Sequence, residues 1–176
     1  MSTYKLFFAG AGGQGVLTMG QMIAYGAMAE DKSVTWLPSY GPEMRGGTAN
    51  CTVVVSDTTV NCPLISDADA VVVMNLPSLL KFESMVKPGG KLFVNSSIIE
   101  QKATRTDIDV VYVPTIELAE ECGSTRTANI VMWGALVRSL GIISYDSAQA
   151  VMKKIFSGSK AKFLPLDQKA FDAFQL

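Results

Sequence analysis

A chain of 176 residues, 48% of them hydrophobic, can build one sizeable core and is short for two, so we expect a single domain over residues 1–176. Fifteen basic and sixteen acidic residues give a net charge of −1, without the run of like charges that nucleic-acid or anionic-membrane binding requires. The opening segment MSTYKLFFAGAG lacks the apolar length of a membrane span or signal peptide, and we expect a cytoplasmic protein.

Short β-branched or aromatic runs alternate with longer helical patterns, which is typical of an α/β architecture. The pattern predicts a three-layer α/β/α fold with a mostly parallel, Rossmann-like sheet. We expect strands at Tyr4–Ala9, Ser33–Leu37, Ala49–Ser56, Ala70–Asn75, Lys91–Asn95 and Asp109–Val113. We expect helices at Val16–Glu30, from Pro77, at Thr115–Glu121, at Thr127–Leu140, after Asp146 and at Pro165–Phe174. We interpret Lys87–Gly90 as a turn, and Thr115 and Asp146 as helix caps.

Cysteine and histidine usage excludes several chemistries. The sequence contains no histidine, and Cys51, Cys62 and Cys122 form no CxxC pair. This chain alone therefore provides neither a zinc site nor an iron–sulfur motif, and it has no Ser-His or Cys-His nucleophile pair. We expect buried, reduced thiols and no cofactor held by this chain alone.

The motif GxGxxG at Gly10–Gly15 lies between the first strand and the first helix. Such a turn lets main-chain N–H groups point at a phosphate on the helix N-terminus. A dinucleotide site also needs an acidic residue at the end of the second strand, where this chain has Leu37, Pro38 and Ser39. Three interpretations stay open: a dinucleotide site, a tight turn that binds nothing, and a site for another phosphate-bearing ligand.

The segment Ser39–Gly47 (SYGPEMRGG) follows the second strand, at the edge where open parallel sheets hold ligands. Its glycines permit positive φ, Pro42 stiffens it, and Glu43 and Arg45 carry opposite charges two residues apart. It is either a loop that reaches a neighbouring site or a surface turn closed by an internal ion pair.

The helix expected at Thr127–Leu140 is apolar nearly all round, more than one small core requires. We therefore expect this helix and the segment Ser39–Gly47 to lie at or near subunit contacts. Expressed alone, the chain should self-associate, with a homodimer as the simplest product.

Four segments together carry a family resemblance. They are GAGGQGV at Gly10–Val16, SYGPEMRGGTANC at Ser39–Cys51, VVSD at Val54–Asp57 and ADAVVVMN at Ala68–Asn75. In order and spacing they resemble the gamma subunits of 2-oxoacid:ferredoxin oxidoreductases, and Asn129 in the last apolar helix extends the resemblance. The second segment is more similar to the 2-oxoglutarate branch than to the pyruvate or indolepyruvate branches.

The resemblance implies an enzyme that decarboxylates a 2-oxoacid on thiamine diphosphate, reduces ferredoxin through [4Fe-4S] clusters and transfers the acyl group to coenzyme A (CoA). It implies that partner subunits of alpha, beta and delta type hold thiamine diphosphate, Mg²⁺ and the clusters, and that ferredoxin is an indirect partner. The chain is then a non-catalytic subunit with no catalytic residue of its own. The alternative from another class is a free-standing nucleotide-binding or redox-sensing regulatory module.

The glycine turn is the candidate site for the co-substrate. We expect Gly12, Gly13, Gln14 and Gly15 to help hold the phosphates of CoA, with Arg45 as a charge partner. The turn presents main-chain donors and a helix dipole to an anion, and the acid that would bind a dinucleotide ribose is missing. The implied reaction also needs a diphosphate-bearing acyl acceptor.

Overall fold

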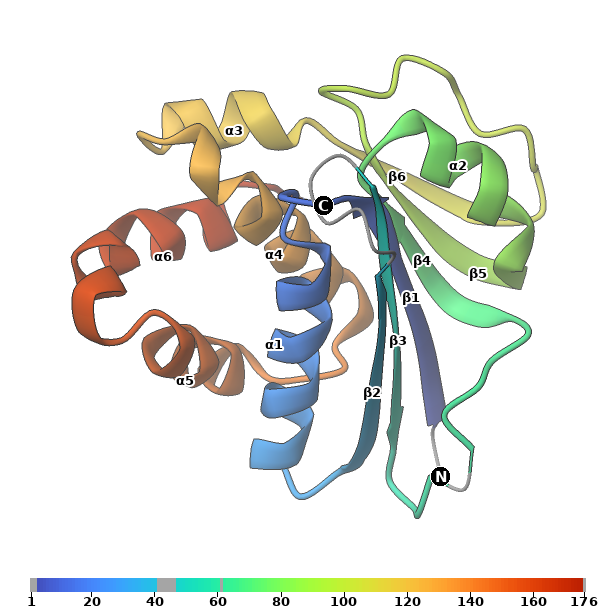
Figure 1. The fold of residues 1–176 in the computed structure, drawn as a ribbon, viewed down its shortest axis with the longest axis horizontal. Coiled ribbons are helices and arrows are strands. Elements are labelled where there is room, and N and C mark those ends of the chain that lie inside the picture. Colours follow the sequence, from blue (N-terminus) through green and yellow to red (C-terminus); the bar gives the residue numbers. More distant parts are fainter. Residues whose placement is uncertain (1–2, 41–46, 61, 176) are drawn as a thin grey trace.

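The computed structural model describes residues 3–40, 47–60 and 62–175, which form a sheet with helices packed on both faces (Figure 1). The strands are β1 (Thr3–Ala11), β2 (Ser33–Tyr40), β3 (Thr48–Ser56), β4 (Ala68–Val73), β5 (Val86–Asn95) and β6 (Asp109–Val113). The helices are α1 (Val16–Ala29), α2 (Leu76–Phe82), α3 (Thr115–Glu121), α4 (Ala128–Leu140), α5 (Tyr145–Ile155) and α6 (Leu164–Asp172). Three 3₁₀ turns accompany them: η1 (Glu83–Met85), η2 (Thr125–Thr127) and η3 (Gly158–Phe163). No described helix is long and apolar enough to cross a bilayer.

The strand order across the sheet is β2-β3-β1-β4-β5-β6. Strands β1, β4, β5 and β6 pair in parallel, whereas β3 runs antiparallel to both β1 and β2. The reversal follows from the connection between β2 and β3, because parallel pairing needs a crossover of about a dozen or more residues. The prediction of a mostly parallel α/β sheet is confirmed, and the end of β2 and the start of β3 lie at the edge where β1 ends.

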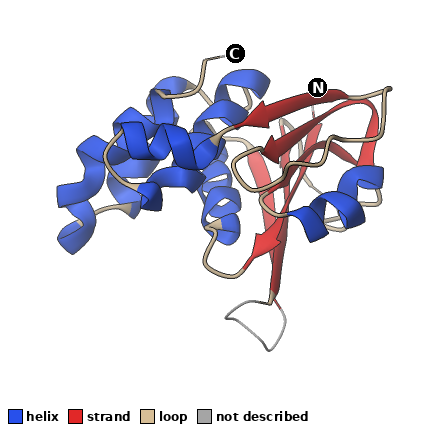
Figure 2. Cartoon of the chain, turned by 90° about the horizontal axis from the view of Figure 1, so that it is seen from above, coloured by secondary structure: helices blue, strands red, loops and turns tan. Residues whose placement is uncertain are grey.

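The two faces of the sheet are covered unequally. Along β1, Leu6 and Phe8 enter the larger core, to which α1, α3, α4, α5 and α6 contribute. Phe7 and Ala9 point to the opposite face and enter a smaller core that includes Leu79 of α2. Figure 2 shows most of the helices gathered on one face. The three-layer arrangement expected from the sequence is therefore present, with one thick and one thin helical layer.

Strand β5 begins earlier than the sequence indicates. The segment Lys87–Gly90, interpreted as a turn, belongs to β5, which starts at Val86. Gly89 has a φ of 75°, and the pairing of β5 with β4 shifts register there. The glycine thus makes an irregularity within a strand, which a sequence pattern does not distinguish from a turn.

Two expected helix caps are wrong. Thr115 is the first residue of α3, and its buried hydroxyl donates to Asn95 Oδ1 at 2.7 Å. Helix α5 is capped by Ser144, whose Oγ accepts from the Ser147 amide at 3.1 Å. Asp146 lies within the first turn of α5 and is exposed. Both assignments failed by one or two positions. The residue before α3 is Pro114, which caps it with no side-chain hydrogen bond, and at α5 Ser144 takes the position expected for Asp146.

Helix α4 is buried by the chain itself. Its residues from Ile130 to Val137 are all buried, and helices α1, α3, α5 and α6 contact it. At Gly134 an added Cβ would lie 2.1 Å from the main-chain oxygen of Phe171, so only glycine lets α4 and α6 approach this closely. The apolar character of Thr127–Leu140 therefore needs no partner subunit to explain it.

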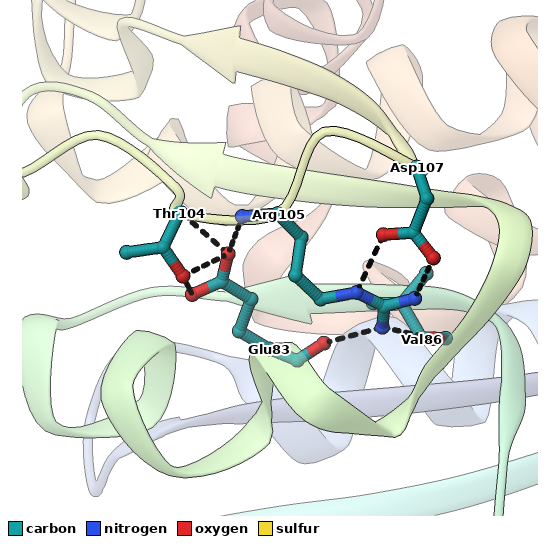
Figure 3. Close-up of polar contacts among 5 residues, drawn as sticks. All are labelled: Glu83, Val86, Thr104, Arg105 and Asp107. Carbon is teal, nitrogen blue, oxygen red and sulfur yellow. Dashed lines mark hydrogen bonds and ion pairs between the residues drawn. The ribbon is translucent and has the colours of Figure 1, made fainter.

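The crossover from β5 to β6 contains no helix in its described residues, and a polar network holds it in place (Figure 3). Glu83 of η1 is 9% exposed, and its carboxylate accepts from the amides of Thr104 at 2.6 Å and Arg105 at 2.8 Å. The Arg105 guanidinium donates to the carbonyl oxygens of Glu83 and Val86 and to both carboxylate oxygens of Asp107. This network ties the crossover to the start of β5.

The three cysteines are free, but they differ in environment. Cys51 is buried, its thiol donates to the Val16 carbonyl oxygen at 3.7 Å, and burial raises its pKa to about 12. Cys122 is partly exposed and Cys62 is exposed. The expectation of buried thiols is therefore right for Cys51 and wrong for Cys62.

Glu30 follows α1 and joins it to the start of α5. Its carboxylate accepts from the Ser144 amide at 2.6 Å and from Lys32 Nζ at 2.9 Å. Partial burial by itself would raise the pKa of Glu30, but these hydrogen bonds lower it to about 2. Ionised Glu30 therefore stabilises the junction of the two helices at neutral pH.

Replacement of Glu30 with Gln should lower the free energy of unfolding at pH 7 by about 1–2 kcal/mol, because charge-assisted hydrogen bonds are lost. A lowered pKa gives stability that is complete above the unfolded-state pKa, so the difference from wild type should shrink as the pH falls from 4.5 towards about 2. Urea denaturation across that range measures it. Exposed Glu100→Gln is the matched control and should change stability by less than about 0.5 kcal/mol.

Candidate functional site

The turn between β1 and α1 depends on two glycines in the left-handed region. Gly13 has a φ of 92° and Gly15 a φ of 74°, conformations that other residues adopt only with strain. Gly15 directly precedes α1, and no side chain caps this helix terminus with a hydrogen bond. The strand-to-helix turn predicted from the sequence is therefore present, with its main chain close to the start of α1.

Gln14 points into the protein and stabilises the turn from within. Its Oε1 accepts from the Ala11 amide at 2.7 Å, and its Nε2 donates to the Met74 carbonyl oxygen at 3.1 Å. The Gln14 amide also donates to the Ala11 carbonyl oxygen at 3.2 Å. These hydrogen bonds connect the turn to the end of β4 and leave the Gln14 side chain little freedom to bind a ligand.

The start of β3 lies beside the glycine turn. The Gly12 amide donates to the Gly47 carbonyl oxygen at 3.0 Å, so the two glycine-containing segments meet at one edge of the sheet, as expected. Between them lies a hollow of about 350 Å³, lined by the turn, the first turn of α1 and residues 47–49. The first turn of α1 contains no acidic residue, so the helix itself supplies no charge that neutralises the positive end of its dipole.

The main-chain amides divide into engaged and available donors. Among the described residues, Gly12 and Gln14 donate to carbonyl oxygens, whereas the amides of Gly13 and Gly15 donate no hydrogen bond. The first turn of an α-helix adds further amides without an intrahelical acceptor. The site can therefore bind an anion through Gly13, Gly15 and the start of α1, which is a smaller set of donors than the sequence motif indicates.

A second hollow, of about 330 Å³, lies on the other side of the turn. Gly13 and Gly15 line it together with Asn95, Asn129 and exposed Arg126. Asn129 packs directly against Gly15, where an added Cβ would lie 2.4 Å from Asn129 Nδ2. Arg126 supplies a cation beside the turn that our sequence reasoning did not single out, because η2 is far from the turn in sequence.

Asn95 forms a fixed wall of this second hollow. The residue is 1% exposed, its Oδ1 accepts from Thr115 Oγ1 at 2.7 Å, and its Nδ2 donates to the Met74 carbonyl oxygen at 3.3 Å. Its position at the carboxyl end of β5 could have indicated it, since ligands in open α/β sheets bind outside this edge. Its hydrogen bonds show that it mainly holds β4, β5 and α3 together.

The structure brings four of the five expected site residues into one turn: Gly12, Gly13, Gln14 and Gly15. The fifth, Arg45, lies outside the described residues. Within residues 3–40, 47–60 and 62–175, no group of three or more His, Cys, Asp or Glu side chains is arranged to hold a metal ion. The described residues therefore do not fit a metal or an iron–sulfur cluster.

Comparison with known proteins decides the family. Residues 5–174 match the family of pyruvate ferredoxin/flavodoxin oxidoreductases. The chain belongs to this family. It is 30% identical over 172 residues to the 2-oxoglutarate synthase subunit KorC of Methanocaldococcus jannaschii, covering 96% of this chain and 92% of that protein. This chain is also 37% identical over 171 residues to the ketoisovalerate oxidoreductase subunit VorA of Methanothermobacter marburgensis.

The match covers 96% of this chain but only 35% of VorA, so the chain spans about a third of the length of that relative. Among solved structures, the gamma subunit of a keto/oxoacid ferredoxin oxidoreductase from Geobacter sulfurreducens PCA has a TM-score of 0.81 at 30% identity, with 97% of this chain and 95% of that one covered. A 2-oxoglutarate:ferredoxin oxidoreductase from Magnetococcus marinus shares the fold, with a TM-score of 0.87 at 23% identity, over 98% of this chain and 30% of that one.

Replacement of Gly15 with Ala should lower the free energy of unfolding by about 2–4 kcal/mol, because strain at positive φ adds to a collision with Asn129. Gly13→Ala is the matched variant: it has a positive φ, but an added Cβ meets no atom of the described residues within 4 Å, so it should cost only about 1–2 kcal/mol. In the double variant Gly15→Ala/Asn129→Ala, part of the loss should be recovered. Equal costs at both glycines in urea denaturation, or strict additivity in the double variant, would contradict this account.

Proposed function

We propose that this chain is the gamma-type subunit of a multisubunit 2-oxoacid:ferredoxin oxidoreductase. The complex would convert a 2-oxoacid and CoA to acyl-CoA and CO₂, with two electrons passed to ferredoxin. Family membership and the near-complete coverage of KorC and of the Geobacter gamma subunit support the proposal.

The chain would act in this complex without a catalytic residue of its own. With three separated cysteines and no histidine, it has too few ligands for a [4Fe-4S] cluster. We therefore assign thiamine diphosphate, Mg²⁺ and [4Fe-4S] clusters to partner subunits of alpha, beta and delta type. The chain's contribution would be to shape the approach of CoA and to hold the subunits together.

The open amides at the glycine turn carry the proposal for CoA. Gly13 and Gly15 have main-chain donors that no described residue uses, and they border both hollows beside the uncapped start of α1. A diphosphate suits such donors and the positive end of a helix dipole. Gly12 and Gln14 would contribute by fixing the turn, and Arg45 and Arg126 by supplying positive charge. The related Magnetococcus enzyme was solved with CoA and succinyl-CoA bound, which makes CoA the reasonable ligand to test.

The CoA proposal is tested by Gly13→Val in the assembled complex. An added Cβ at Gly13 would meet no atom of the described residues within 4 Å, so the valine side chain would extend into the space that the ligand is proposed to occupy. We expect the KM for CoA to rise by about tenfold or more, while decarboxylation of the 2-oxoacid stays closer to normal. Steady-state kinetics with CoA as the varied substrate measures the change.

The matched control is Gly89→Val, which also places a valine at a positive φ but lies in β5 and not in the glycine turn. Gly89 has a φ of 75°, and an added Cβ there also meets no atom within 4 Å. The control should lose stability as Gly13→Val does and keep the wild-type KM for CoA. An unchanged CoA dependence in properly assembled Gly13→Val complex would reduce the turn to a packing element.

For the substrate we propose 2-oxoglutarate, because the segment Ser39–Cys51 resembles the 2-oxoglutarate branch. The relatives include subunits for 2-oxoglutarate and for ketoisovalerate, so substrate choice needs a direct measurement. The complex, purified with its native partner subunits, should show its highest kcat/KM with 2-oxoglutarate. The kcat/KM values with pyruvate and with ketoisovalerate should be lower by about tenfold or more. A preference for either of the other acids would contradict the assignment, and failure to copurify with partners would contradict the subunit role.

A further inference from the structure

A third hollow lies in the helical layer, away from the sheet. Its volume is about 410 Å³, and η2, the end of α5, η3 and the start of α6 surround it. Apolar side chains from three of these elements line it: Phe156, Phe163 and Leu166. The hollow is large enough for a small ligand, and it is lined by residues that the proposed CoA site does not use, apart from Arg126.

Asp167 is the unusual residue in this hollow. It lines the hollow and is 5% exposed. With the described residues it makes neither a hydrogen bond nor an ion pair, and burial raises its pKa to about 6. A carboxyl group taken from water without a partner costs free energy, and proteins normally pair such groups. The Asp167 oxygens are not among the fully buried polar atoms, so the unpartnered carboxyl group faces the hollow and is open to a cation or N–H donor that enters it.

The helix dipole does not account for this burial. Asp167 lies in the first turn of α6, where a negative charge is favourable. Asp146 occupies the corresponding turn of α5 and is exposed, so it gains the same interaction without losing solvent. Glu30, which is also partly shielded, shows the usual solution, because an amide and an ammonium group bind its carboxylate. An unpartnered acid on the wall of a hollow instead leaves an acceptor that a ligand entering the hollow can use.

The charged residues around the hollow differ in sign and in burial. Asp167 is buried, whereas two cationic residues, Arg126 and Lys160, line the same hollow and are exposed. Neither cation forms an ion pair with Asp167. Phe156, Phe163 and Leu166 supply apolar surface beside these charges. A complementary ligand carries a cationic donor, an anionic group and a compact apolar body.

We propose that this hollow binds a free α-amino acid with an apolar side chain. The ammonium group would donate to Asp167, the carboxylate would face Arg126 and Lys160, and the side chain would pack on the apolar wall. This zwitterion satisfies the buried carboxyl group and adds no net charge. The site shares Arg126 with the CoA proposal but rests on Asp167 and the apolar wall, which that proposal does not use, and it can be tested on the full chain without partner subunits.

Three probes separate the interactions: L-leucine, 3-methylbutylamine, which lacks the carboxylate, and 4-methylpentanoate, which lacks the amine. Calorimetric titration of the full chain at pH 7 should show saturable binding of L-leucine, with a Kd of about 1 mM or lower. Each half-ligand should bind at least about tenfold more weakly. Amide chemical shifts should change around residues 156–167 and stay unchanged at the glycine turn.

Asp167→Asn keeps the shape of the side chain and removes the negative charge, so we expect a folded protein whose affinity for L-leucine falls about tenfold or more. Lys160→Ala tests the contact with the ligand carboxylate. It should weaken the binding of L-leucine and leave the affinity for 3-methylbutylamine unchanged. Asp146→Asn is the matched control, as an acid in the first turn of α5, and should bind like wild type.

Several outcomes would overturn the proposal. These are the absence of saturable L-leucine binding up to about 10 mM, equal binding of 4-methylpentanoate, and unchanged affinity in Asp167→Asn. Adenosine monophosphate serves as a further probe, since its base could stack on the phenylalanines and its phosphate could face the cations. If it binds in preference to L-leucine, the hollow is a nucleotide site and the amino-acid assignment is wrong.

Discussion

The helical layer depends on how closely α4 can approach its neighbours. At Gly134 the main chain of α4 lies against the main chain of α6, and at its start Asn129 packs against Gly15 of the turn. One contact sets the position of α6 and the other sets the position of the glycine turn. Because both are close contacts to glycine, α4, which packs in the centre of the larger core, also fixes the position of the glycine turn through Asn129.

Much of the fold could be predicted from local patterns. All six strands and the main helices were expected, and apart from the early start of β5 they lie close to the expected positions, because buried β-branched runs and apolar helical repeats are strong signals. The direction of β3 was not anticipated, since direction depends on the length of the connection and not on the strand's own residues. The caps at Thr115 and Asp146 were misplaced because a sequence pattern fixes the first residue of a helix only to within one or two positions.

The candidate site was predictable in outline and not in detail. The glycine spacing correctly indicated a tight turn before a helix, and the pairing of Gly12 with Gly47 places the second glycine segment beside it. The spacing could not show that the Gln14 side chain points inward to Ala11 and Met74. Nor could it bring Arg126 or Asp167 into view, because their surroundings are made by tertiary packing of helices distant in sequence.

The network of Glu83 and Arg105 has a consequence for the dynamics of the crossover between β5 and β6. Loops of this kind usually open at little cost, because their amides are bonded to water. Here the Thr104 and Arg105 amides are bonded to a carboxylate that is itself shielded, and the guanidinium occupies two carbonyl oxygens near the start of β5. To exchange these amide protons with solvent, the chain must break a charged network and partly release the start of β5. In hydrogen exchange, a segment without regular secondary structure would thus behave as part of β5.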